Sequence, residues 1–423
     1  MKQHILGFII IIFSSYCYAS GSYDYPFDNA LIATVVGTPS EDFAKLPQNI
    51  QREEREVIVF PDREVNTFFP NKELHYSLVT QPHKAPLIFS IAGTGASHRS
   101  PKMRVIEKAF YQAGFHVISL PSPTYANFIT TASSSQVPGH IIDDSEDLYR
   151  VMGLINAELE SHIAISEFHL IGYSLGGAQA AFIAQIDDDK KQFNFKKTLM
   201  INPPVSLFNS VSQLDQLLEK NIPGGVENFV PYFNELMDEF TEMYTETDEV
   251  DFNDDFLYSI YQKRKQNIDL TRVASLIGLS FRLSSANMIF TSDIVTGGGY
   301  ILPKHHQLEK TESTTKYFKK SMKMSFTDYF NDRFHPFFQA IEPSLTKDAL
   351  KYRSSLNSIA DYLRTAKHIA VVHNEDDIIL APGEINFFRE TFKARAHIYP
   401  TGGHCGNFAY HDNVAYMVNY FQN

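Results

Sequence analysis

The order in which apolar and helical stretches follow one another is the feature that most constrains the fold of this chain. From Pro86 on, short apolar runs alternate with stretches whose apolar residues recur at helical spacing. This alternation is typical of a parallel sheet that is covered on both faces. We therefore expect an α/β fold with a doubly wound, mostly parallel sheet. The predicted strands are 87–91, 115–120, 168–172, 198–201, 369–372 and 396–399, and the predicted helices are 101–113, 144–159, 175–186, 382–392 and 411–421.

The two ends of this pattern set the expected domain organisation. Residues 20–55 show little periodicity and are interpreted as an arm over the surface, whereas 56–60 and 73–80 predict an antiparallel strand pair. About 160 residues separate the strand ending near Asn202 from the strand beginning at His368. Because links in such folds are normally short, this gap predicts a large inserted cap. We expect a core of 20–204 and 366–423 and a mainly helical insert over 205–365, with helices at 226–244 and 255–267.

The N-terminus has the form of a signal peptide. A charged start is followed by the apolar run Ile5–Phe13 and by a small-x-small site that ends at Ala19. We expect residues 1–19 to be removed and the protein to be exported to the periplasm or the medium. Cleavage would leave Cys405 as the single cysteine. No other apolar run approaches the about 20 residues of a membrane span, so no stable membrane anchor is expected after cleavage.

Charge narrows the range of partners. The net charge of −12 argues against nucleic acid, whose binders concentrate Lys and Arg where the phosphates dock. Within the insert, the stretch 215–255 holds thirteen Asp and Glu against one Lys. We interpret this run as a solvated helix face. If it roofs a pocket, it would repel anionic substrates.

The stretch 168–177 carries the main chemical signal. An apolar strand runs into Gly172-Tyr-Ser174-Leu-Gly176, and a helix of small residues begins at once. A tight strand-to-helix turn needs glycine on both sides and holds the serine in a strained backbone with its oxygen exposed. The start of the helix also favours developing negative charge. Ser174 is the predicted nucleophile.

These residues resemble the α/β-hydrolase superfamily, within its lipase, esterase and serine-peptidase-like members. The resemblance covers about 80–204 and 366–423, and the insert lies where that superfamily often carries a lid or cap. It implies a Ser-His-acid triad in the chain order serine, acid, histidine. It also implies that no metal and no cofactor are needed.

The base and the acid are expected in two loops near the C-terminus. His404 follows the last short strand in a glycine-rich loop, and His411 is a nearby competitor. The preceding strand ends in three consecutive carboxylates, of which Asp377 fits the expected acid position best. Asp376 is the runner-up and Glu375 is third. The selected carboxylate would orient the imidazole without taking its proton.

An oxyanion hole requires two preorganised N–H donors. The backbone of Leu175, directly after the predicted nucleophile, would supply one. The second is expected in the loop Ala92-Gly-Thr-Gly-Ala96, with Thr94 as the donor, or Gly95 if the loop is shifted by one residue.

A cleavage reaction through an acyl-enzyme follows from these residues. The aromatic insert favours a small-molecule or lipid-like neutral ester, so a carboxylic ester hydrolase is the first expectation. A peptidase or a thioesterase could use the same triad. A catalytically silent ligand-binding homologue is the alternative from another class, and labelling of the serine by an organophosphonate would exclude it.

Overall fold

A computed structural model describes residues 23–66, 68–245, 258, 261–263, 265–304, 306, 308–309 and 311–423. The predicted signal peptide, residues 1–19, lies outside this part of the chain. The described chain forms one eight-stranded sheet in the order β1-β2-β4-β3-β5-β6-β7-β8. The strands are β1 (Arg52–Ile58), β2 (Glu73–Val79), β3 (Ala85–Ile91), β4 (His116–Leu120), β5 (Ile165–Tyr173), β6 (Lys197–Ile201), β7 (Ile369–Asn374) and β8 (Ala396–Tyr399).

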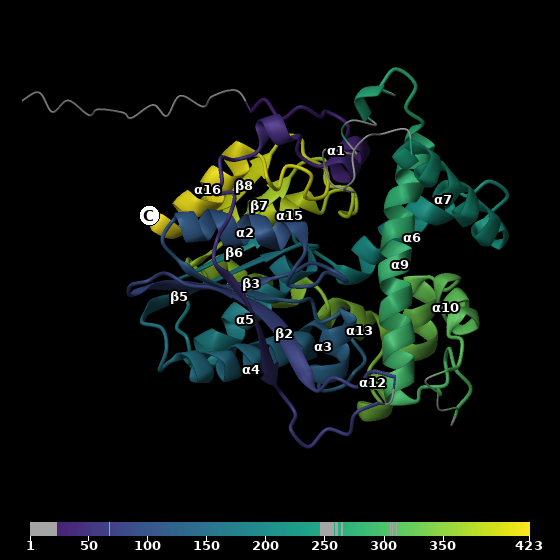
Figure 1. Cartoon of the computed structure of the whole chain (residues 1–423), viewed down its shortest axis with the longest axis horizontal. Coiled ribbons are helices and arrows are strands. Elements are labelled where there is room, and N and C mark those ends of the chain that lie inside the picture. Colours follow the sequence, from purple (N-terminus) through teal and green to yellow (C-terminus); the bar gives the residue numbers. More distant parts are fainter. Residues whose placement is uncertain are drawn as a thin grey trace, which may run out of the picture.

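The sheet is mixed but mostly parallel, as predicted. β2 pairs antiparallel with both β1 and β4, and every pairing from β4 to β8 is parallel. Helices cover both faces: α2 and α16 pack on one face and α4 and α5 on the other (Figure 1). Outside the chain between β6 and β7, the described α-helices are α1 (Ala30–Val36), α2 (Pro101–Gln112), α3 (Ala126–Thr131), α4 (Ile141–Leu159), α5 (Leu175–Lys190), α15 (Ile385–Phe392) and α16 (His411–Gln422).

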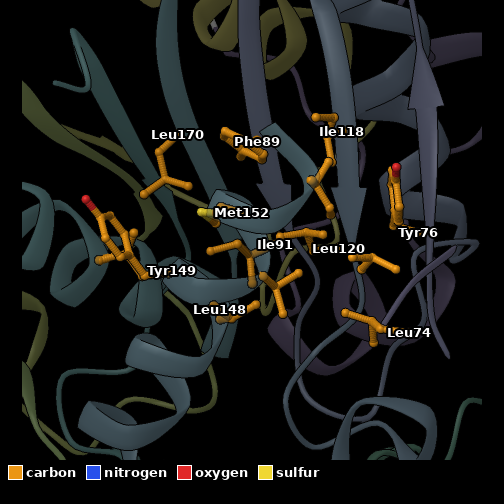
Figure 2. Close-up of a cluster of buried hydrophobic side chains, with 14 of the residues drawn as sticks. Leu74, Tyr76, Phe89, Ile91, Ile118, Leu120, Leu148, Tyr149, Met152 and Leu170 are labelled. Atoms are coloured by element: carbon orange, nitrogen blue, oxygen red, sulfur yellow. The ribbon is translucent and has the colours of Figure 1, made fainter. Parts of the chain in front are cut away.

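Burial explains why the strands read as continuous apolar runs. Phe89 and Ile91 of β3 are fully buried and belong to one cluster of apolar side chains with Met152 of α4 (Figure 2). On the opposite face, Ile88 of β3 packs with Phe110 of α2. Neighbouring residues of a strand therefore each meet a helix layer, and both must be apolar.

The N-terminal segment differs from the prediction of a surface arm. It contains the helix α1, capped by the Asn29 side chain, and β1 begins at Arg52 instead of Glu56. α1 contacts the long helix α9 (Leu270–Thr296) and the loop that follows β8 (Figure 1). With 7 residues it is too short to show a helical repeat in the sequence, which is why periodicity missed it.

The chain between β6 and β7 is helical where the structure describes it. Its helices are α6 (Leu207–Glu219), α7 (Phe229–Thr245), α9, α10 (Thr315–Met322), α11 (Phe326–Tyr329), α12 (His335–Ile341), α13 (Lys347–Arg353) and α14 (Ala360–Thr365). The predicted helix 226–244 corresponds to a short 3₁₀ turn followed by α7. Of the second predicted helix, 255–267, the structure describes 258, 261–263 and 265–267, and of these 258 and 261–263 are helical. That 205–365 forms a separate unit stays a prediction.

Helix α9 was not predicted. It bears on the expectation that no apolar run after the signal peptide approaches the length of a membrane span. It is 27 residues long with a mean hydropathy of 1.3 in its most apolar window, enough to cross a membrane by length and composition. However, 67% of that window is buried inside the protein, and the helix carries the fully buried Arg282. A core helix has the same composition, so this finding is weak support for a membrane span.

Arg282 joins α9 to α6 in the interior. Its Nη2 atom lies 2.9 Å from Asp215 Oδ1 and 3.0 Å from Glu219 Oε1. Asp215 also accepts the backbone N–H of Phe326 at 2.7 Å. Burial raises the pKa of Asp215 even though the guanidinium opposes that rise. The two helices are therefore held together by a charge pair that is shielded from water.

Replacing Arg282 with methionine is expected to destabilise the protein by about 3 kcal/mol, because removal of one partner leaves a buried carboxylate uncompensated. Urea unfolding of the variant should show this loss. As a control, Arg364→Met removes an exposed ion pair with Asp361 and should change the free energy of unfolding little. Equal stability of the Arg282→Met variant and the wild type would contradict the prediction.

Candidate active site

The turn between β5 and α5 has the strained geometry that its glycines suggest. Ser174 adopts φ 54° and ψ −125°, a conformation that non-glycine residues rarely take. A Cβ atom at Gly172 would lie 2.1 Å from the Gly176 carbonyl oxygen, and one at Gly176 would lie 2.4 Å from the Ile91 carbonyl oxygen. Only glycine fits at both positions, so the sharp turn presents the serine at the carboxyl end of the sheet.

Three predicted site residues meet at this end of the sheet. Ser174 Oγ lies 2.9 Å from His404 Nε2, and His404 Nδ1 lies 3.1 Å from each carboxylate oxygen of Asp377. With the proton on Nδ1 donated to the carboxylate, Nε2 is free to accept from the serine hydroxyl. The predicted competitor His411 is exposed at the start of α16, where its ring contacts Asp412.

The environment of Asp377 keeps its carboxylate fixed and ionised. Its oxygens accept hydrogen bonds from Asn202 Nδ2 at 2.9 Å and from the Ile379 N–H at 3.1 Å. Burial alone would raise the pKa of Asp377, but the charge and hydrogen bond of His404, with the nearby His373, lower it below its ordinary value. The carboxylate is therefore a permanent acceptor for the imidazole.

The neighbouring carboxylates point elsewhere. Asp376 accepts the backbone N–H groups of Gly403 at 2.9 Å and Gly402 at 3.3 Å, in the turn that leads to His404. Glu375 is exposed and pairs with Arg389. Asp376 thus stabilises the backbone of the loop, and of the three carboxylates only Asp377 contacts the imidazole of His404.

Helix α1 also holds the histidine loop, which sequence reasoning missed. The His404 N–H donates to Thr34 Oγ1 at 2.9 Å, and the Thr34 hydroxyl donates to the Ala30 carbonyl at 2.6 Å. Gly403 and Gly406 pack so closely on this helix that a Cβ atom at either would lie within 2.3 Å of its backbone oxygens. The glycines of the loop therefore permit the approach of α1.

Residues on either side of α1 add further contacts to the same loop. The Tyr23 hydroxyl donates to the Thr401 carbonyl at 2.9 Å, and the Thr38 hydroxyl donates to the Gly406 carbonyl at 2.8 Å. These partners are more than 360 positions apart in the chain. Nothing in the local sequence indicates such a pairing.

For the hydrolase activity that the sequence predicts, Thr34→Val is expected to lower kcat about tenfold, because valine keeps the shape of threonine but cannot accept the His404 N–H. Thr34→Ser should restore most of the rate, since it keeps the acceptor. Both are measured by steady-state hydrolysis of an activated ester. A Thr34→Val variant with the kcat of the wild type would show that the contact does not position the ring.

The backbone N–H groups of Leu175 and Thr94 have no acceptor among the described residues. Both residues line the cavity above the serine. The alternative donor Gly95 is already engaged, because its N–H donates to Thr124 Oγ1 at 2.8 Å. Of the two positions weighed in this loop, Thr94 is thus the one with an open donor.

A cavity of about 580 Å³ opens over Ser174 and His404. Helices α6 and α9 form one wall of this cavity, and most of its side chains are apolar, including Leu207, Val211, Leu214, Leu276, Leu279 and Phe281. No acidic side chain is among the described residues that line it. Asp215, the first residue of the acidic stretch, is buried behind this wall with Arg282.

Comparisons with known proteins give a likeness in structure only. No family model and no curated protein matches the sequence. Similar solved structures include a membrane phospholipase A, described as a bacterial virulence factor, at 13% identity and TM-score 0.43, covering 88% of this chain and 86% of that one. An esterase from Rhizomucor miehei has 13% identity and TM-score 0.42, covering 90% and 85%. A proline iminopeptidase from Mycobacterium smegmatis has 14% identity and TM-score 0.41, covering 88% and 98%.

These values are too low to carry an argument about activity. The fold rests instead on the strand order, on the antiparallel β2 beside otherwise parallel neighbours, and on the strand–turn–helix unit at Ser174. Each of these agrees with the sequence resemblance. The chain has the α/β-hydrolase fold.

Proposed function

We propose that the protein is a serine hydrolase that cleaves carboxylic esters, with Ser174 as the nucleophile, His404 as the base and Asp377 as the residue that orients the imidazole. The observation that carries this proposal is the hydrogen-bonded line from Ser174 through His404 to Asp377 at the floor of an apolar cavity. Such a line activates a serine hydroxyl that is otherwise a weak nucleophile.

In the proposed reaction, His404 Nε2 takes the proton of Ser174 as the serine oxygen attacks the ester carbonyl. The negative charge that develops on the carbonyl oxygen is stabilised by the N–H groups of Leu175 and Thr94. His404 then protonates the departing alcohol, and an acyl-enzyme remains on Ser174. Water, activated by the same imidazole, releases the acid. Asp377 stays ionised throughout and stabilises the imidazolium.

The cavity favours an ester over an amino-terminal peptide. Its wall from α6 and α9 is suited to an acyl chain. A peptidase that binds a free amino group would need a carboxylate in the wall, and the described lining residues include none.

We also propose that the protein acts outside the cytoplasm after removal of residues 1–19. N-terminal sequencing of the exported protein, with Ser20 as the expected first residue, tests that step.

The experiment that tests the proposed function combines labelling and turnover. A fluorophosphonate probe should label the mature protein and should fail to label a Ser174→Ala variant. A series of p-nitrophenyl esters of increasing chain length should be hydrolysed, whereas aminoacyl p-nitroanilides should not. Absence of labelling in folded wild-type protein would instead support a silent binding protein, and preferential cleavage of the anilides would support a peptidase.

A further inference from the structure

One charged side chain interrupts the apolar wall of the cavity. Among the described lining residues, Lys102 is the only Lys, Arg, Asp or Glu. It is half-buried, and no carboxylate lies within ion-pair distance of its Nζ atom among the described residues. The nearby Arg99, by contrast, is paired with Glu54 at 3.1 Å. A partly buried and unpaired ammonium next to apolar side chains lacks the compensation that such groups normally have.

Lys102 is related to the residues that flank Ser174 and His404 in the chain. It lies in the first turn of α2, two residues after Ser100, whose Oγ atom lies 3.1 Å from the Tyr173 hydroxyl directly before the nucleophile. Its charge also reaches Cys405, where it opposes the rise in thiol pKa that burial causes. Cys405 follows His404 in the chain and lines the same cavity.

The geometry of the reaction assigns the two walls of the cavity to different parts of an ester. His404 must protonate the departing alcohol, so the alcohol lies on the side of the imidazole. Cys405 directly follows His404, and the charge of Lys102 acts on the Cys405 thiol across the same cavity, so we assign Lys102 to that side. The acyl chain then lies against the apolar residues of α6 and α9. A substrate that uses both walls is amphiphilic, with an apolar acid and an alcohol that carries negative charge.

We propose that Lys102 binds an anionic group, a carboxylate or a phosphate, on the alcohol portion of the ester substrate. This inference rests on the proposed function and deepens it. It replaces the expectation of a neutral ester, which was based on the aromatic insert and on repulsion of anions by its acidic stretch. That stretch contributes no described residue to the cavity wall, and its member Asp215 is neutralised by Arg282.

Substrates matched in all but charge test the proposal. Octanoyl esters of 3-hydroxypropanoic acid, of its uncharged amide and of 3-hydroxypropyl phosphate share one acyl chain. In the wild type, the better anionic ester should exceed the amide about 30-fold in kcat/KM, the value of one charge-assisted contact. In Lys102→Met this ratio should fall to about one, and Lys102→Arg should retain it. Lys108→Met, on the same helix but outside the cavity wall, should keep the wild-type ratio.

Each outcome of this experiment decides the question. A wild-type ratio near one, or a ratio that survives in Lys102→Met, overturns the proposal. A preference for the carboxylate ester or for the phosphate ester identifies the anion. If no ester is cleaved, the proposed function fails, and binding of the non-hydrolysable ether analogues measured by calorimetry still tests Lys102. Anionic and amide ethers that bind the wild type equally would then overturn the inference by themselves.

Discussion

The Ser174→Ala variant is expected to hydrolyse esters about 10⁶-fold more slowly than the wild type at saturating substrate. The reason is chemical: without the hydroxyl no acyl-enzyme can form, and His404 has no proton to remove from the nucleophile. Only the N–H groups of Leu175 and Thr94 and the cavity itself would remain. Steady-state kcat with an activated p-nitrophenyl ester measures this loss.

Alanine carries the same Cβ atom as serine, so the positive φ of this turn strains both residues equally. The variant should therefore fold as the wild type does. Equal thermal unfolding midpoints would establish that the lost rate is not lost structure. Ser161→Ala, which changes an exposed serine after α4, is the matched control and should keep full activity. A Ser174→Ala variant that retains more than about one thousandth of the wild-type kcat would exclude Ser174 as the nucleophile, given the expected size of the effect.

The parts of this protein that could be predicted from the sequence are those that local physics determines. At Gly172 and Gly176 the backbone of the turn leaves no room for a side chain, so the pattern around Ser174 can be interpreted without any distant contact. The same holds for the sheet. β3 and the second half of β5 are buried on both faces, and the apolar runs that such burial requires are visible in the sequence.

The remaining features depend on contacts between distant segments. Thr34 meets His404 across 370 positions, and a seven-residue helix such as α1 has no periodic signature. Helix α9 escaped prediction because it is apolar around most of its circumference and contains a charged residue, Arg282, that is paired only in the folded protein. The number of charged residues in the insert was also insufficient to predict the charge of the substrate, because it does not reveal which side chains face the cavity.

The choice among the three consecutive carboxylates is a special case. Glu375, Asp376 and Asp377 have similar chemistry, and their order along the chain favours none of them strongly. The turn after β7 decides between them, since it directs Asp377 toward the imidazole and Asp376 toward the backbone of the next loop. Spacing in the sequence ranks Asp377 first, Asp376 second and Glu375 third, and their functional roles can be separated by substitution.

Asp377→Asn is expected to lower kcat about 10⁴-fold while the fold is kept. An amide at this position can donate to Nδ1, which favours the tautomer with its proton on Nε2, where it cannot accept from Ser174. The kcat of the variant and the wild type with the same activated ester, measured across pH, gives the effect. Asp376→Asn should lower kcat only about tenfold, since it loses one of the two hydrogen bonds to the Gly402–Gly403 turn and leaves the imidazole's partner intact.

Stability against acid gives a second, independent measure of the same pair. The pKa of Asp377 is held below its ordinary value in the folded protein, so its ionised form stabilises the fold above the pKa of the unfolded chain. This contribution is lost as pH falls through the lower, folded pKa. Unfolding of Asp377→Asn should therefore depend less on pH in the acid range than unfolding of the wild type. If Asp376→Asn instead shows the larger loss of kcat and the flatter acid profile, the assignment of the triad acid to Asp377 is wrong, because both effects follow from the carboxylate that contacts the imidazole.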